Sequence, residues 1–153
     1  MQKSKNIKQN TLRYKMKQKH LRVEKFLDEM NKIIPWNSLC EEIKPYYNKG
    51  NAGDKGRNSH CLSKMLKIHF LQLWNNLSDP AVEEAIYDRL SFQKFIGFDC
   101  FGGTVPDESS ICRFRHILEE NNLSKKLLEK VNNYLIENEI LVEKGTIVDA
   151  TII

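Results

Sequence analysis

The chain has 153 residues, of which 41% are hydrophobic and 29% charged, a composition typical of one soluble globular domain. Its 9% aromatic content, 7 Gly and 4 Pro exclude a low-complexity disordered chain. No apolar run approaches the roughly 20 residues of a membrane span. The N-terminal lysines are followed by more lysines rather than by the apolar segment of a signal peptide. We therefore expect a cytoplasmic protein with no membrane partner.

The net charge of +4 conceals a strong asymmetry along the chain. Residues 1–25 contain nine lysines and arginines against Glu24 alone, a local charge of +8, and the remainder carries −4. A segment with this charge repels itself and is attracted to polyanions through the release of their counterions. Residues 1–20 are therefore predicted to be a flexible, disordered basic arm with nucleic acid as its partner. Charge alone leaves open a tail that only aids solubility.

Residues 21–142 are predicted to form the helical domain. An apolar stripe predicts a first helix that stops at Pro35. Ser38 and Glu41 resemble a capping box that starts a short second helix. Pro45 is expected to kink or end that helix. The residues of the stripe are Val23, Phe26, Leu27, Met30, Ile33 and Ile34.

Residues 48–58 contain three glycines and form the clearest loop of the sequence. They lack the order of a phosphate-binding P-loop, and Asp54 would repel a phosphate. We predict instead that Lys55 and Arg57 contact a DNA backbone. Ser59 is predicted to cap the next helix, whose apolar positions between residues 62 and 77 are so widespread that it should be central to the bundle.

Within this central helix, His69 is interpreted as a satisfied interior or boundary histidine. Asp79 and Pro80 predict the start of the next helix, as cap and first helical residue. A short helical segment at residues 92–96 follows closely, so the pair forms either a DNA-binding helix-turn-helix or an ordinary corner of an all-α domain. The predicted buried side of the first of these helices consists of Val82, Ala85, Ile86 and Leu90.

After a second loop at residues 99–106, residues 107–120 predict a helix, and Ser124 is expected to cap the last one. Asp107 and Glu108 fit a helix start, where the helix dipole favours negative charge. The sequence therefore predicts an all-α bundle of about five to seven helices. Residues expected inside the last two helices are Ile111, Phe114, Leu118, Leu127, Leu128, Val131, Tyr134 and Leu135.

The helical spacing of apolar residues ends before residues 143–153. There, a run of β-branched residues bounded by glycine predicts a β-strand. A single strand cannot satisfy its own backbone, so we expect an orphan strand whose partners are absent and a chain that is cut off.

No Cys-x-x-Cys pair occurs among the cysteines, which favours reduced thiols. The alternative is a metal site on Cys112 and His116, which share a helix face, with His60 and Cys61 as further ligands. Structural zinc sites usually have two closely spaced ligand pairs, so core or boundary roles are the favoured interpretation. The four cysteines are Cys40, Cys61, Cys100 and Cys112.

Several segments, in the family's order, resemble the N-terminal part of a bacterial insertion-sequence transposase of the IS-five type. The resemblance extends from about Phe26 to Ile153. The segments that carry it are Ile34-Pro35-Trp36, Met65 to Trp74, Asn76 to Asp79, Pro106 to His116 and Gly145 to Ile153.

The resemblance implies that residues 143–153 start a truncated ribonuclease-H-like core with an Asp-Asp-Glu (DDE) triad. It assigns Asp149 as the first catalytic, metal-binding carboxylate. The family's chemistry uses two Mg²⁺ ions to cut and join phosphodiesters. Because the second Asp and the Glu are missing, we expect this chain to be inactive in strand transfer, and whether it is an enzyme is left undecided.

The leading hypothesis is an N-terminal fragment of a DDE transposase that binds terminal-repeat DNA at transposon ends, associated with the bacterial nucleoid. The alternative is a stand-alone, non-catalytic DNA-binding or dimerising module that modulates a full-length transposase. A homodimer or a full-length transposase is the further partner in this case. The predicted DNA-binding residues are Lys15, Lys17, Lys19, Arg22, Lys55, Arg57, Arg113 and Arg115.

Overall fold

The computed structural model describes residues 19–47, 60–98 and 104–140, and these ranges contain seven helices and no strand. The predicted all-α bundle is confirmed over them. Most of the basic arm and the strand predicted at residues 143–153 lie outside the described residues. The helices are α2 (Arg22–Ile33), α3 (Trp36–Tyr47), α4 (Leu62–Asn75), α5 (Asp79–Asp88), α6 (Leu90–Ile96), α7 (Glu108–Glu120) and α8 (Leu123–Glu137).

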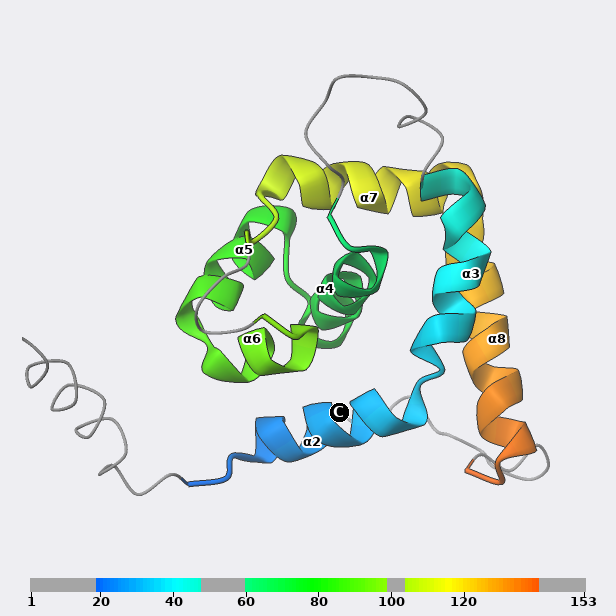
Figure 1. Ribbon diagram of the computed structural model, residues 1–153, viewed down its shortest axis with the longest axis horizontal. Coiled ribbons are helices and arrows are strands. Elements are labelled where there is room, and N and C mark those ends of the chain that lie inside the picture. Colours follow the sequence, from blue (N-terminus) through cyan, green and yellow to red (C-terminus); the bar gives the residue numbers. More distant parts are fainter. Residues whose placement is uncertain (1–18, 48–59, 99–103, 141–153) are drawn as a thin grey trace, which may run out of the picture.

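Helix α4 lies at the centre of the bundle, and α3, α5, α6 and α7 pack against it (Figure 1). Its side chains Met65, Leu66, Ile68 and Leu71 are buried although they point in different directions around the helix. A helix that is apolar on several sides must be covered on several sides. The prediction of a central helix is therefore confirmed.

An aromatic cluster joins α2, α3, α4 and α6. The ring centroids of neighbouring members lie 5.2 to 5.8 Å apart, and most of the pairs meet edge to face. Such arrangements stabilise beyond the area that they bury. The cluster consists of Phe26, Trp36, Phe70, Trp74 and Phe95.

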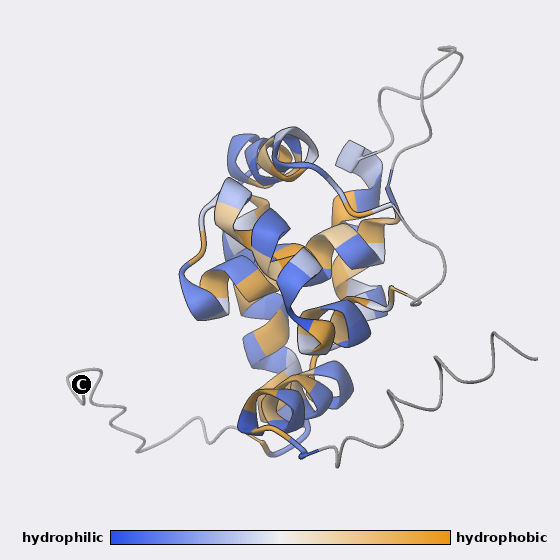
Figure 2. Ribbon diagram, turned by 90° about the vertical axis from the view of Figure 1, so that its left-hand side faces the viewer, coloured by the Kyte–Doolittle hydropathy of each residue, from blue (hydrophilic) through white to orange (hydrophobic). Residues whose placement is uncertain are grey.

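Helix α8 covers the other side of α3 and α7 (Figure 1). Leu123 and Leu127 are buried at its start, and Lys130 Nζ lies 2.8 Å from Glu42 Oε1 of α3. Figure 2 shows apolar and hydrophilic residues alternating along the helices of the bundle. No helix in the described ranges has the length and apolar character that crossing a membrane requires.

Several predicted helix starts are wrong. Helix α3 begins at Trp36, directly after Pro35, so Ser38 lies inside it. The Pro35 carbonyl accepts the first helical hydrogen bond from the Leu39 amide, so the helix starts ahead of Ser38. Pro45 also lies inside α3, which continues to Tyr47.

The other cap predictions shift by one to two residues. Cys61, not Ser59, occupies the cap position of α4. Ser78 caps α5 by accepting a hydrogen bond from the Ala81 amide, and Asp79 is the first helical residue. Asn122, in the left-handed region at φ 52°, precedes α8, so Ser124 lies inside that helix. Asparagine tolerates this conformation better than most residues.

Some side chains that lie on predicted apolar stripes or buried sides are exposed instead, because they lie at helix ends or beside the packed stripe. Leu90, the first residue of α6, is 73% exposed, and Leu128 of α8 is 61% exposed. Val23 and Phe26, near the start of α2, are also exposed.

We expect Leu71→Ala to lower the free energy of unfolding by about 2–5 kcal/mol, because it leaves a cavity where α4 is fully enclosed. Leu73→Ala is the matched control on the same helix, since Leu73 is 63% exposed and should cost no more than about 0.5 kcal/mol. Urea unfolding measures both. Equal losses would contradict the central position of α4.

Candidate functional site

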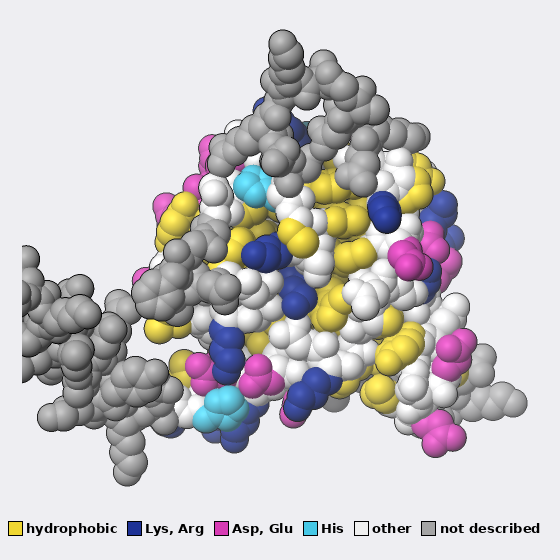
Figure 3. Space-filling model, in the orientation of Figure 1, with side chains coloured by type: hydrophobic (Ala, Val, Ile, Leu, Met, Phe, Trp, Pro, Cys, Tyr) yellow, Lys and Arg dark blue, Asp and Glu magenta, His cyan; other side chains and the backbone are white. Residues whose placement is uncertain are grey.

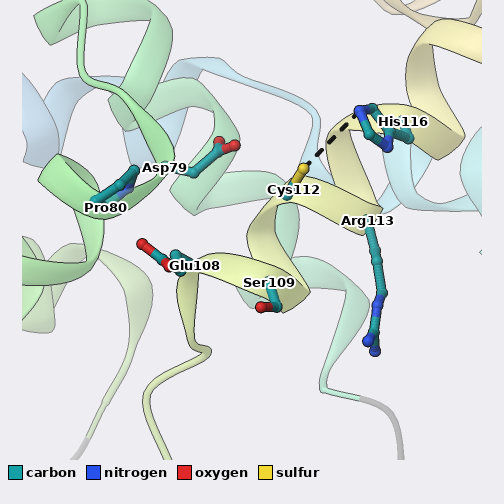
Figure 4. A pocket seen from close by; sticks show the side chains of 7 residues that line it. All are labelled: Asp79, Pro80, Glu108, Ser109, Cys112, Arg113 and His116. Atoms are coloured by element: carbon teal, nitrogen blue, oxygen red, sulfur yellow. Dashed lines mark hydrogen bonds between the residues drawn. The ribbon is translucent and has the colours of Figure 1, made fainter.

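An open cleft of about 530 Å³ lies between the start of α5 and the first half of α7 (Figure 4). Its lining combines two carboxylates with a guanidinium, an imidazole and a thiol, so it favours neither sign of charge. The lining residues are Asp79, Pro80, Glu108, Ser109, Cys112, Arg113 and His116.

Asp79, at the inner wall of the cleft, joins three helices. Its Oδ1 accepts a hydrogen bond of 2.8 Å from Gln72 Nε2 of α4, and its Oδ2 one of 3.0 Å from Arg115 Nη2 of α7. The hydrogen bond from Arg115 holds the pKa of Asp79 below its usual value. Arg115 also pairs with Glu119 at 3.0 Å, and these hydrogen bonds raise the pKa of its guanidinium. Asp79 thus ties the cleft to a structural ion-pair network whose other members, Arg115 and Glu119, lie outside the lining.

Cys112 and His116 face one another across one helical turn, as their spacing predicts. Cys112 Sγ lies 3.8 Å from His116 Nε2 (Figure 4). Among the described residues, however, no group of three or more His, Cys, Asp or Glu side chains is placed to hold a metal ion. The predicted alternative of a metal site with His60 and Cys61 therefore gains no support from the geometry.

His69 lies behind this network, mostly buried against the edge of the Phe114 ring, with centroids 6.3 Å apart. Burial, and then the charge of Arg115, lower its pKa. Its Nδ1 is buried without a hydrogen-bond partner among the described residues. The partial burial of the ring agrees with the predicted interior or boundary histidine.

The structure does not bring together those predicted DNA-binding residues that lie in its described ranges. Lys19 and Arg22 are exposed at the start of α2, while Arg113 is exposed on α7, across the bundle (Figure 1). Arg115 is engaged by Asp79 and Glu119. The remaining predicted site residues lie outside the described residues, and they are Lys15, Lys17, Lys55, Arg57 and Asp149.

Two lysines of α4 stand out that were not predicted from the sequence. Lys67 Nζ donates to the Phe95 carbonyl at 3.2 Å, and Lys64 Nζ lies 4.7 Å from the centre of the Phe98 ring. The only signal in the sequence is their three-residue spacing inside a largely apolar helix.

A family model described as "Transposase domain (DUF772)" matches residues 12–117 of the chain. The matched segment includes part of the predicted basic arm, all of α2 to α6 and most of α7, and it leaves α8 outside. No solved structure matches the chain.

We expect Asp79→Asn to lower the free energy of unfolding by about 1–3 kcal/mol at neutral pH, because Asp79 is only 15% exposed and loses a charged hydrogen bond. Since pairing lowers the pKa of Asp79, its contribution should be complete above pH of about 4 and lost as the pH falls further.

The matched control is Asp88→Asn at the exposed end of the same helix, which should change stability by no more than about 0.5 kcal/mol. Urea titrations between pH 3 and 7 measure the effect. A loss for Asp79→Asn that persists undiminished at pH 3 would contradict this account.

Proposed function

The chain belongs to the family of transposase domains, and from this premise we propose that it is the helical domain of a transposase that binds the DNA of transposon ends. The observation that carries the proposal is the extent of the family match, which covers well over half of the chain. It begins within the basic arm, so Lys15, Lys17, Lys19 and Arg22 belong to the matched segment.

The charge distribution supports DNA as the partner. The +8 charge of residues 1–25 continues directly into α2, whose Arg22, Lys25 and Lys32 are exposed at spacings that place them on one helix face. A cationic segment attached to a rigid helix supplies phosphate contacts that are independent of DNA sequence. Binding to chromosomal DNA would place the protein at the bacterial nucleoid.

We further propose that the transposase is of the IS-five type and DDE class, with Asp149 as the first carboxylate of its triad. Mg²⁺ bound there would supply activation of the attacking oxygen and stabilisation of the leaving oxygen. The described residues offer no group that fits such an ion. Asp149 is the one triad member that the resemblance places in these 153 residues, so we assign no cleavage step to this polypeptide.

We expect the 153-residue protein to bind a terminal-repeat duplex at low salt, with log affinity falling linearly against log salt. Lys15→Gln/Lys17→Gln should reduce the steepness of that slope by about 0.9 for each phosphate that is no longer neutralised. Lys125→Gln/Lys126→Gln on α8, outside the family match, makes the same charge change and should leave the slope intact. Fluorescence anisotropy measures both. Absence of binding at low salt would refute the proposed function.

We expect no cleavage of the same duplex by this polypeptide in Mg²⁺ or Mn²⁺, because one carboxylate cannot hold a two-metal centre. A gel-based cleavage assay tests this, with Asp149→Asn as the matched variant and a nuclease as the positive control. Cutting that disappears in Asp149→Asn would contradict the prediction.

A further inference from the structure

Lys67 of α4 is held in place by aromatic rings and a backbone carbonyl. Its Nζ donates to the Phe95 carbonyl at 3.2 Å and lies 5.5 Å from the ring centres of both Trp36 and Phe95. The side chain is half-buried, and this burial lowers the pKa of its ammonium. The lysine is therefore fixed in direction before any partner binds.

Lys64 lies one turn earlier on the same side of α4, because residues three apart share a helix face. Its Nζ lies 4.7 Å from the centre of the Phe98 ring, just after the end of α6. Together, Lys64 and Lys67 with the rings of Trp36, Phe95 and Phe98 form a surface that we name the α4–α6 basic face.

No carboxylate compensates these two ammonium groups within the described residues. None of the ion pairs there involves Lys64 or Lys67. The ionisable side chains that influence the pKa of Lys67 through their charge are Cys40 and Cys61, and neither is a carboxylate. Figure 3 shows dark blue Lys and Arg side chains on this side of the molecule, over α4, α6 and α2, with magenta acidic side chains interspersed over α2.

An anion would gain more from such lysines than from flexible ones on a helix surface. Their side chains have already given up much of the conformational freedom that binding would otherwise cost. A half-buried ammonium also has an incomplete shell of water, and a phosphate oxygen can occupy the place of the missing water molecules. The aromatic rings contribute the platform that holds the charges.

The position of the face along the chain adds a second argument. Helix α4 begins at Leu62, shortly after residues 48–59. These contain Lys55 and Arg57, so the predicted backbone contacts lie within ten residues of Lys64 along the chain. The whole face lies inside the segment that matches the transposase domain family.

We propose that the α4–α6 basic face contacts the sugar-phosphate backbone of duplex DNA through Lys64 and Lys67. The inference rests on the proposed function and deepens it, because it names the surface that the folded domain presents to DNA in addition to its arm.

Binding of a random-sequence duplex to the full chain, titrated against salt, tests the proposal. Lys64→Gln/Lys67→Gln should reduce the steepness of the log affinity against log salt by about 1.8, one step of about 0.9 for each lysine. Lys125→Gln/Lys126→Gln, with the same charge change on α8, should retain the slope of the unmodified protein. Lys64→Gln alone should remove about half of the effect.

Lys64→Gln alone keeps the test valid if the double variant does not fold. Lys67 also donates to the Phe95 carbonyl, whereas the described contact of Lys64 is with the Phe98 ring. Thermal unfolding shows whether each variant folds. If the unmodified chain binds DNA and folded Lys64→Gln has the same slope as the α8 control, the α4–α6 basic face is refuted while the proposed function stands. If the unmodified chain binds no duplex at low salt, both fail.

Discussion

The constraint on which this fold depends is that α4 must be covered on nearly every side. Met65, Leu66, Ile68 and Leu71 point in different directions and are all buried, so α3, α5, α6 and α7 have to surround them. The few polar groups of α4 are consequently forced into specific arrangements. Gln72 bonds Asp79, which in turn holds Arg115 of α7, and Lys67 reaches the end of α6. One apolar helix thus sets both the packing and the positions of the charges around it.

Periodicity predicted the described helices well, because apolar spacing along a segment is a local property. It could not predict which serine caps a helix or which leucine remains uncovered, since both depend on neighbours. Pro35 starts α3 ahead of Ser38, and Leu128 lies beside the stripe that meets α3 and α7. The site was less predictable still. Arg115 was expected at DNA, but it lies against Asp79, 36 residues earlier in the chain, and no local pattern encodes that pair.

The charges of this transposase domain fall into two groups with different consequences. Arg115 is satisfied by two carboxylates and serves the packing of α5 against α7. Lys64 and Lys67 face rings and a carbonyl, and they keep their positive charge available to an anion. A basic arm that attracts DNA over long distance and rigid lysines that meet its phosphates at short distance would complement one another. The mixed charge of the α5–α7 cleft fits neither task.

The most direct test of this account is the map of backbone amide shifts in the NMR spectrum of the full chain as duplex DNA is added. We expect the largest shifts in the basic arm and α2, in the first half of α4 and at the end of α6, with α8 unchanged. Shifts confined to α8 or to the α5–α7 cleft would contradict the account, as would a spectrum that DNA leaves unaltered.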